Sequence, residues 1–586
     1  MPQAFRTYPP AVHQVQGSNR RRRAAARLWD RLRTPVWVAR IVGLVGLVTL
    51  VSAVSPELRS RMAVVDGLVP AVFPAAAMTG AAAVGLVLIG LSRALRRGKH
   101  RAWVLATVLA AVAAALHLLK GLDVEEATVS VAGFVLLVSA RGRFTAKPDP
   151  RSPRRVVTVL VVGTVLATAL GWLWLAMDPD GQATGTTALD RLTQAFLGLV
   201  GISGPVRFVD PTDSARAAVA LAVLGASLLL TACFVALKPA GGPHPLGEEE
   251  RERLEGLLVR WGGIDSLSYF ATRHDRSVLF SPSGKAAITY RVVGAVSLAA
   301  GDPLGDPEAW PGAIAAWLDE ARSFGWVPAV LAAGERGAEA FHRAGFDALE
   351  LGDEAILHVS DFSLCGRSMR VVRQAVSRCE RSGLTVACHR LEDLDAETVE
   401  QLRARADEWR DGAVERGFSM ALGRFAERQD DRSVVVTCRD RGGELRGLLH
   451  LVPWGADGLS LDLMRRDRTA ENGVVEQMVA GLMAAAPTLG VTRVSLNFAV
   501  FRSVFARGER LGAGPVLRVW RSVLLWASRF WQIESLYRAN AKYQPEWVPR
   551  FVCFRSSADL PRVSVAALRA EAFLVAPRWA QRLARY

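Results

Sequence analysis

The chain has 586 residues, of which 51% are hydrophobic, and its mean hydropathy is +0.20. This length exceeds that of one ordinary domain and this hydropathy exceeds that of a purely soluble protein, so the composition predicts a membrane part. The formal net charge of +16 and the pI near 10.3 indicate an anionic partner, and charge alone leaves lipid headgroups and nucleic acid both open.

The cysteine and histidine pattern argues against two common frameworks. The six cysteines form no C-x-x-C pair and no two histidines have H-E-x-x-H spacing, so we expect neither a disulfide framework nor a metal, and no cofactor. A reducing, cytosolic environment fits best. The basic start, with Arg20 to Arg23, lies too far from the first apolar run for a removable signal peptide.

Six long apolar runs occupy the first part of the chain. They span residues 36–55, 69–91, 102–119, 124–140, 156–177 and 217–237. Each is about long enough to cross the roughly 30 Å hydrocarbon layer as a helix, although 124–140 meets this length least well. We therefore predict a six-helix transmembrane domain over residues 36–237.

Loop charge predicts the orientation, because Lys and Arg accumulate on the cytoplasmic side of a membrane. The N-terminal segment 1–35 and the loops 92–101 and 141–155 are strongly basic, whereas the loop 120–127 is net acidic. This pattern places the N-terminus in the cytoplasm and, after six crossings, the C-terminal part as well. The segment 188–202 is apolar enough either to lie in the membrane interface or to re-enter the bilayer.

The composition changes near residue 238. Residues 238–250 are rich in Pro and Gly and indicate a linker. Beyond them short β-rich runs alternate with helical ones, which is typical of α/β architecture. We expect strands in SVLFSP, AAITYRVV, AVSLAA, WVPAVLA, SVVVTCR, LRGLLHLVP, LSLDLM and RVSLNF, and helices over 311–325, 338–345, 368–383, 396–412 and 473–486.

The order of these elements suggests two similar modules. We expect a first module over 251–365, a basic connecting helix over 366–383, and a second module over 384–586 with a C-terminal basic and aromatic segment. The second module contains a β-α-β unit, and a helix followed by Ala344-Gly345-Phe346 closes the first. This order resembles the GNAT acyltransferase superfamily. The predicted fold class is thus a multi-pass α-helical membrane domain followed by a cytosolic α/β tandem GNAT-like acyltransferase domain.

One feature of that superfamily is missing. Its acetyl-CoA users bind pyrophosphate in a basic, Gly-rich turn at a helix start. The strand-to-helix junction after Met464 contains no convincing copy of that turn. The acyl donor is therefore not expected to be CoA.

Ordered motifs in the cytosolic part carry a more specific resemblance. They are Ser268-Tyr269-Phe270, Gly301-Asp302-Pro303-Leu304-Gly305, Gly352-Asp353-Glu354-Ala355, Phe362-Ser363-Leu364-x-Gly366, Gly417-Phe418-Ser419, Asp462-Leu463-Met464-Arg465-Arg466, Glu471-Asn472-Gly473 and Lys542-Tyr543-Gln544-Pro545-Glu546-Trp547. They resemble the aminoacyl-phosphatidylglycerol synthase family (MprF-like). The segments 495–499 and 537–543 are most similar to the synthase half of actinobacterial members that carry a fused lysyl-tRNA synthetase.

The resemblance implies an activity and a set of partners. Members transfer an amino acid, usually lysine, from aminoacyl-tRNA to phosphatidylglycerol, which lowers the negative charge of the membrane and resists cationic antimicrobial peptides. The implied partners are lysyl-tRNA, phosphatidylglycerol in an anionic membrane, and a separate aminoacyl-tRNA synthetase. Two alternatives stay open: a non-catalytic lipid flippase or scaffold, and a GNAT-like transferase with another acyl donor.

The segment LSLDLMRRD, residues 459–467, carries the candidate catalytic residues Asp462 and Arg465. Strand alternation predicts that its leucines share one face and that Asp462 points to the other. A carboxylate there can hold the α-ammonium of the donor or take the proton of the lipid hydroxyl, while Arg465 and Arg466 suit a phosphate. The structural alternative is an Asp462–Arg465 ion pair that only closes the strand.

Further candidates come from the same motifs and from two basic helices. The candidate substrate-binding residues are Arg466, Asn497, Lys542, Glu354 and Asp302, and the candidate contacts to tRNA or lipid phosphate are Arg370, Arg373, Arg378, Arg518 and Arg521. The alternative for Asp302 is an ordinary Gly-Asp-Pro turn, and for Lys542 a solvated base. The alternatives for the two helices are a solvated basic face and core packing of the tryptophans.

Overall fold

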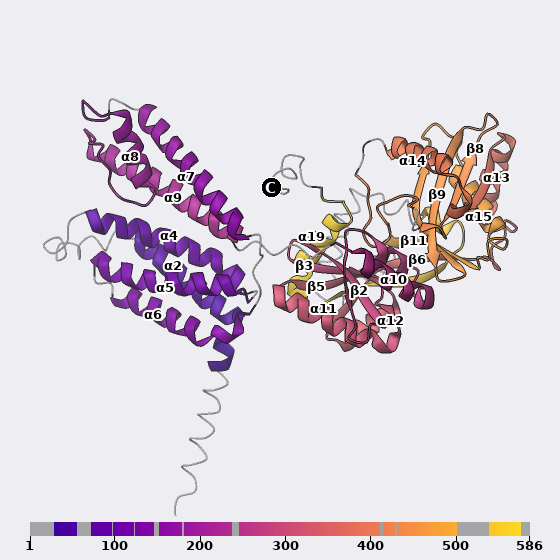
Figure 1. The fold of residues 1–586 in the computed structure, drawn as a ribbon, viewed down its shortest axis with the longest axis horizontal. Helices are drawn as coiled ribbons and strands as arrows, with labels where there is room; N and C mark the ends of the chain where they lie inside the picture. Colours follow the sequence, from indigo (N-terminus) through magenta and orange to yellow (C-terminus); the bar gives the residue numbers. More distant parts are fainter. Residues whose placement is uncertain are drawn as a thin grey trace, which may run out of the picture. The chain divides into compact units, whose positions relative to one another are not determined.

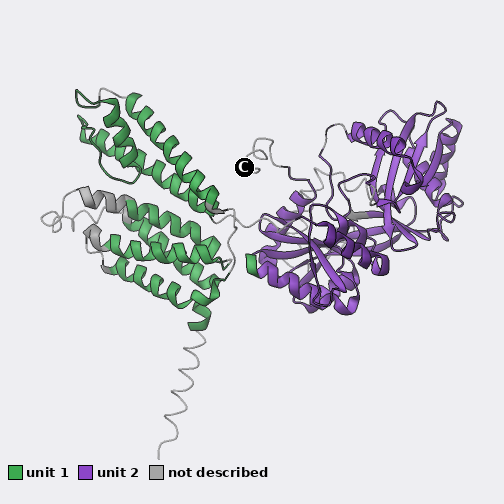
Figure 2. Ribbon diagram, viewed as in Figure 1, with its two compact units in different colours: residues 1–240, 323–325 green, residues 241–322, 326–586 purple. Residues whose placement is uncertain are grey.

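The computed structural model describes residues 29–54, 72–96, 98–121, 124–145, 152–177, 181–236, 245–410, 412, 414–427, 430–500 and 538–575. The chain divides into two units, residues 1–240 with 323–325 and residues 241–322 with 326–586 (Figure 2).

The first unit is built of helices. They are α2 (Pro35–Val54), α4 (Val72–Leu95), α5 (His100–Gly121), α6 (Val124–Ser139), α7 (Ser152–Met177), α8 (Ala188–Gly198) and α9 (Pro211–Ala236), as Figure 1 shows. Each predicted apolar run is helical over its described residues. By length and composition, four spans among the described residues are able to cross a membrane: Pro35–Ser52, His100–His117, Arg154–Met177 and Pro211–Ala236. The predicted membrane region is therefore confirmed, while the number of crossings and their direction stay predictions.

Two glycines let helices α2 and α4 approach each other closely. A Cβ atom on Gly46 of α2 would lie 2.7 Å from the carbonyl oxygen of Gly85 in α4. A Cβ atom on Gly85 would likewise lie 2.7 Å from the carbonyl oxygen of Gly46. Small residues let helix backbones approach in this way, which gains van der Waals contact where the hydrophobic effect is absent. Helix α8 is short and amphipathic and packs against α7 and α9. Its predicted place in the membrane interface stays open.

The second unit is one mixed sheet with helices on both faces. Its strands are β1 (Ser277–Phe280), β2 (Ala286–Val293), β3 (Val296–Ala300), β4 (Leu304–Gly305), β5 (Val327–Ala333), β6 (Asp347–His358), β7 (Thr385–Arg390), β8 (Val434–Arg439), β9 (Leu445–Trp454), β10 (Gly458–Arg466), β11 (Arg493–Val500) and β12 (Glu546–Phe554). Its helices are α10 (Glu248–Trp261), the 3-10 helix η3 (Ser268–Thr272), α11 (Trp310–Phe324), α12 (Glu335–Arg343), α13 (Arg370–Arg381), α14 (Ala396–Arg410), α15 (Val474–Ala485) and α19 (Leu560–Ala570). The strand order is β1-β2-β3-β5-β12-β6-β11-β10-β9-β8-β7, with β4 beside β2.

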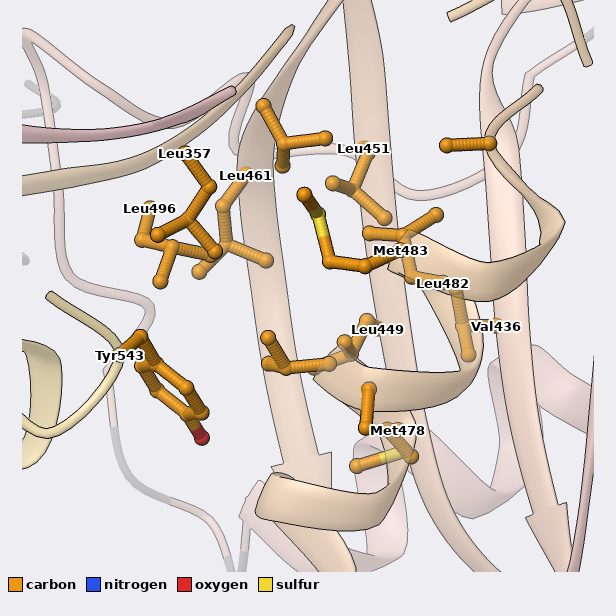
Figure 3. Packing of buried hydrophobic residues seen from close by; sticks show 14 of the residues in the cluster. Leu357, Val436, Leu449, Leu451, Leu461, Met478, Leu482, Met483, Leu496 and Tyr543 are labelled. Carbon is orange, nitrogen blue, oxygen red and sulfur yellow. The ribbon is translucent and has the colours of Figure 1, made fainter. Parts of the chain in front are cut away.

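Amphipathic helices close the core over the strands that carry the predicted site. Helix α13 repeats Val372, Ala375, Val376 and Cys379 at helical spacing on its buried face. It packs with α15 over one face of β8, β9 and β10, where aliphatic side chains of the strands meet Met478 (Figure 3). Helix α14 covers the other face. The predicted β-α-β unit is present, because β10 and β11 are parallel and α15 connects them.

The eight strands and five helices expected in this unit all form, which fits the predicted GNAT-like fold class. Strands β4, β6, β7 and β12 and helices α10 and α19 were not predicted. The placement of β12 is the largest difference, because this strand near the end of the chain pairs with β5 on one side and β6 on the other. Residues 546–554, which the sequence assigned to the second module, thus complete the sheet of the first. The predicted linker, 238–250, ends inside α10, which begins at Glu248.

A buried set of charged and polar groups joins the two halves of the sheet. Arg550 of β12 places Nε and Nη2 at 2.9 and 2.5 Å from Glu354 of β6, and its Nη1 at 2.7 Å from Asp265. Ser266 donates to Glu354 at 2.5 Å, and Ser495 of β11 donates to the same carboxylate oxygen. We call these five residues the central charge network. Burying charges in this way is tolerable only when each is paired and hydrogen-bonded.

Asp302 lies at the edge of the central charge network. Its backbone N–H donates to Asp265, and its carboxylate accepts from the N–H of Gly334 at the start of α12. Burial, followed by the negative charge of Asp265, raises the pKa of Asp302 to about 7. A carboxyl group with a raised pKa favours the folded state most when protonated, so this contribution is fully present below the ordinary pKa of 3.8 and is lost as the pH rises through about 7.

Asp302→Asn is expected to remove this pH dependence. The amide keeps an acceptor for Gly334 but cannot ionise, so the variant should gain unfolding temperature relative to wild type as the pH rises from about 4 to about 7. The measurement is tryptophan-monitored thermal unfolding of the full chain across that range. Asp347→Asn, at an exposed carboxyl, is the control. If the difference in unfolding temperature between wild type and Asp302→Asn does not change with pH, the prediction is contradicted.

Candidate active site

A β-bulge lies in the middle of β10. Opposite β9, Leu461 pairs with Leu451 and Leu463 pairs with His450, so Asp462 is the extra residue. A bulge breaks the period-2 alternation and re-aims side chains. Leu461 accordingly packs in the core beneath α15, whereas Leu463 packs in the opposite cluster with α14. The prediction that the leucines of this segment share one face is therefore wrong for Leu463.

The carboxylate of Asp462 is held at both oxygens. Its Oδ1 accepts a hydrogen bond from the N–H of Leu422 at 2.7 Å, and its Oδ2 lies 2.7 Å from Nδ1 of His450. Because an ionised carboxylate only accepts hydrogen bonds, Nδ1 of His450 is the donor. The side chain of Asp462 is 4% exposed and that of His450 is 0% exposed. Asp462 thus points away from the core beneath α15, as predicted.

Arg465 pairs with a residue that the sequence did not single out. Its Nη2 lies 2.7 and 2.9 Å from the two carboxylate oxygens of Glu415, and Arg410 approaches the same carboxylate at 3.6 Å. Within the described residues Asp462 pairs with His450 and Arg465 with Glu415. The Asp462–Arg465 ion pair considered as the structural alternative is therefore not the contact that closes the strand.

These side chains line one cavity of about 220 Å³ beside α14, which we call the α14 pocket. Its charged lining consists of Asp407, Glu415, Asp462, Arg403, Arg410, Arg424 and Arg465. Both signs of charge therefore face the same small volume. Such a lining suits a ligand that carries an ammonium group together with a phosphate, since each finds an opposite charge nearby.

The loop that brings Glu415 and Leu422 to the α14 pocket is anchored on the first half of the sheet. We call residues 414–427, between α14 and β8, the crossing loop. Arg273 donates to the carbonyl oxygens of Gly417 and Ala421. Further anchors are Phe418 in a core cluster with β3 and β5, Arg276 at the Phe418 carbonyl, Arg424 at the Thr272 carbonyl, and Glu571 at the N–H groups of Phe418 and Ser419. Both halves of the sheet therefore shape the pocket.

Strands β10 and β11 separate next to the bulge. They pair only over Gly458–Ser460 and Arg493–Ser495. Asn497 follows in the left-handed region with a φ of 68°, which Asn tolerates better than most residues. Its Nδ2 donates to the carbonyl oxygen of Leu461 at 2.7 Å, and its Oδ1 is buried with no hydrogen-bond partner among the described residues. The predicted substrate-binding Asn497 thus touches the residue before Asp462.

Lys542 lies on the α15 side of the sheet. Its Nζ is 2.5 Å from Glu476 in the first turn of α15 and 5.0 Å from the ring centre of Tyr543. Tyr543 packs in the core with Leu496 (Figure 3), and burial raises the pKa of its phenol. In the part of the chain that the structure describes, the phenol oxygen has no hydrogen-bond partner. An acidic first turn suits the positive end of the helix dipole and repels a pyrophosphate. The expectation that CoA is not the donor stays a prediction.

The remaining predicted residues lie elsewhere. Glu354 belongs to the central charge network and Asp302 borders it, so protein groups already engage both carboxylates. Arg466 is exposed at the end of β10. On α13, Arg370 is exposed, Arg373 donates to the carbonyls of Leu364 and Gly366, and Arg378 donates to that of Asn472. Arg518 and Arg521 lie outside the described residues.

Sequence reasoning missed His450, Glu415 and the backbone N–H of Leu422. The signal for His450 was present, since it is the one titratable residue in the apolar run LLHLVP. Glu415 and Leu422 carry no comparable signal. Their partners Arg465 and Asp462 lie at sequence separations of 50 and 40 residues, which local patterns do not reveal.

Comparisons with known proteins agree with both units. The family described as "Phosphatidylglycerol lysyltransferase, C-terminal" matches residues 256–554, and the family described as "Transmembrane region of lysyl-tRNA synthetase" matches residues 31–237. The solved structure of L-PGS from Bacillus licheniformis aligns with a TM-score of 0.50 and 23% identity, over 57% of this chain and 99% of that chain. That likeness concerns the fold.

Curated relatives extend the match. The chain is 45% identical over 505 residues to the lysylphosphatidylglycerol biosynthesis bifunctional protein LysX of Rhodococcus opacus, covering 84% of this chain and 45% of that protein. The protein of the same name from Mycobacterium avium is 44% identical, with 84% and 42% covered. The chain thus spans less than half of the length of these relatives. With the family match over 256–554, the chain belongs to the phosphatidylglycerol lysyltransferase C-terminal family.

Proposed function

We propose that this chain transfers lysine from lysyl-tRNA to the glycerol headgroup of phosphatidylglycerol. The family match over residues 256–554 is the observation that carries the proposal. The names of the relatives, which refer to lysylphosphatidylglycerol biosynthesis, support lysine as the amino acid. The product is cationic and lowers the negative surface potential of the membrane, so resistance to cationic antimicrobial peptides is the expected biological outcome.

The reaction requires little beyond the alignment of the two substrates and the transfer of one proton. The lipid hydroxyl oxygen attacks the ester carbonyl of lysyl-tRNA, a new C–O bond forms, and the C–O bond to the terminal ribose of the tRNA breaks. The proton of the lipid hydroxyl ends on the ribose oxygen that leaves. Because the donor is already an activated ester, holding the two reactants in the correct geometry supplies much of the rate enhancement.

Asp462 is proposed to hold the α-ammonium of the lysyl group. Each carboxylate oxygen has two lone pairs, and the N–H groups of Leu422 and His450 use one on each. The remaining lone pairs are available to a third donor in the α14 pocket, which Asp462 lines. A carboxylate with two donors already in place suits an anchor better than a proton acceptor.

Arg465 and Arg466 are proposed to bind phosphate at the mouth of the site. Glu415 orients the Arg465 guanidinium by accepting from Nη2 with both of its oxygens. Nη1, which makes a long contact of 3.4 Å to the Met464 carbonyl, is proposed to turn to a phosphate oxygen. Asn497 and Lys542 are proposed to contact the donor where β10 and β11 separate. The unpaired Oδ1 of Asn497 supports this, since a buried amide oxygen gains from a donor.

The proposed partners follow from charge and position. Arg370, Arg373 and Arg378 on α13 are proposed contacts to the tRNA backbone, and a separate synthetase is proposed to charge the tRNA. Arg518 and Arg521, in the segment outside the described residues, are proposed contacts to tRNA or lipid phosphate. The N-terminus and the sheet unit are proposed to face the cytoplasm, because the basic loops favour that side and charged tRNA is found there.

A transfer assay tests the proposal directly. Membranes that contain the full chain are incubated with tRNA charged with labelled lysine, and the lipid extract is analysed by mass spectrometry. Lysyl-phosphatidylglycerol is expected, and alanyl-tRNA serves as the control for amino-acid choice. Absence of aminoacyl lipid from either tRNA supports a flippase or scaffold, and transfer from an acyl-CoA instead supports another acyl donor. Either result contradicts the proposal.

Asp462→Asn is expected to lower kcat by about 100-fold, because the amide has one acceptor fewer and no charge to hold an ammonium. Rates of lysyl transfer at saturating tRNA provide the measurement. Asp467→Asn, five residues along the same segment and paired with Arg446, is the matched control and should retain its turnover. If Asp462→Asn keeps the turnover of wild type, this carboxylate has a structural role only.

Exchanging the charges of Glu415 and Arg465 tests whether Arg465 binds phosphate or only forms a structural ion pair. Each single change, Glu415→Arg or Arg465→Glu, leaves two like charges in contact and should reduce both stability and transfer. The double variant restores this ion pair and should recover part of the unfolding temperature, because the new guanidinium at position 415 then faces Arg410. It should not recover kcat, because no guanidinium stands where the phosphate binds. Recovery of transfer along with stability would show that Arg465 only closes the strand.

A further inference from the structure

His450 is a buried titratable residue that the proposed reaction does not use. It lies in β9, and its imidazole is fully buried on the α14 face of the sheet. Nδ1 donates to Asp462, and the ring of Phe425 stands edge-on with centroids 5.1 Å apart. Within the part of the chain that the structure describes, Nε2 has no hydrogen-bond partner.

Packing alone does not favour histidine at this position. Its neighbours on the same face of β9, Leu448 and Val452, are aliphatic and buried. A buried polar group costs free energy unless it is hydrogen-bonded, and only one of the two ring nitrogens of His450 is satisfied. An aliphatic residue would fill the site without that penalty. The one hydrogen bond that His450 makes is therefore the feature that distinguishes it from its neighbours.

That hydrogen bond orients a residue that the pairing of β10 with β9 leaves without a partner. Asp462 is the extra residue of the bulge, so it has no partner residue opposite it in β9. Its carboxylate is oriented instead by two donors from different elements, the crossing loop through Leu422 and β9 through His450. One donor would leave the group free to turn about its Cβ–Cγ bond. Two donors on opposite oxygens fix the plane of the carboxylate.

We propose that His450 is a positioning residue, which holds the Asp462 carboxylate in the orientation that presents it to the α14 pocket. The inference rests on the proposed function, because it assigns how the ammonium-binding carboxylate is kept in place. His450 is not proposed to touch substrate, since its free Nε2 is buried and the imidazole does not line the pocket. The relevant atom is Nδ1, and the relevant tautomer carries its proton there.

Three substitutions at His450 separate positioning from packing. His450→Leu fills the site without a donor and is expected to lower kcat by about 10- to 100-fold, since small displacements of a positioned group cost that much. His450→Asn places its amide nitrogen near the original Nδ1 and should recover most of the loss. His450→Gln places its amide nitrogen near Nε2 and should not. The KM for lysyl-tRNA is expected to change little, because the tRNA body supplies most of the binding.

Two controls and a spectroscopic readout complete the test. Val436→Ala removes buried volume from β8 on the opposite face and should lower the unfolding temperature without lowering kcat. In the full chain with labelled histidine, the nitrogen NMR signals of His450 should report a proton on Nδ1, and Asp462→Asn should abolish that signature.

The outcomes are distinguishable. If wild type transfers lysine but His450→Leu keeps its kcat, the inference is overturned and the proposed function stands. The same holds if His450→Asn and His450→Gln have equal kcat values, or if the kcat of each variant changes only in proportion to its unfolding temperature. If wild type transfers no lysine, the proposed function fails. The NMR signature then decides on the orientation of Asp462 alone, and a proton on Nε2 in wild type contradicts the inference.

Discussion

The arrangement of the sheet unit depends on the buried pairing of Arg550 with Glu354 and Asp265. Taking such charges out of water costs several kcal/mol for each ion, so the three groups are tolerable only together. Their pairing ties β12, from the end of the chain, to β6 and to the segment before η3. Ser495 then attaches β11 to the same carboxylate of Glu354. Because β11 carries Asn497, which holds Leu461, the network sets the position of the bulge from a distance.

The motifs that identify the family mostly build this framework. Glu354 of the Gly-Asp-Glu-Ala motif and Asp302 of the Gly-Asp-Pro motif are buried among protein partners. Tyr269 of the Ser-Tyr-Phe motif donates to Asp430, and Phe418 of the Gly-Phe-Ser motif fills a core cluster in the other half. A motif shared by a family therefore marks what the fold needs as often as what the reaction needs. This is why the sequence identified the family more easily than the role of each residue.

Local patterns predicted the elements whose cause is local. Apolar periodicity marked the strands around β8 to β11 and the helices α13 and α15. It failed at Leu463, because a bulge is set by pairing with β9 rather than by the residues of β10. It also could not place β12, whose partners β5 and β6 lie about two hundred residues earlier in the chain. The partners of Asp462 and Arg465 were missed for the same reason, since hydrogen bonds across the sheet leave no periodic signal.

The bulge has a consequence for how two substrates can meet. A regular strand would keep the α14 face and the β10–β11 edge apart, because each residue serves one side only. Here Asp462 faces the α14 pocket while the carbonyl of the preceding Leu461 is bound by Asn497 at the point where β10 and β11 separate. Neighbouring residues of one strand thus act on the α14 pocket and on the β10–β11 junction. Under the proposed function, Asp462 in the pocket and Asn497 at the junction would both contact the lysyl ester at this irregularity, and the central charge network holds β11 beside it.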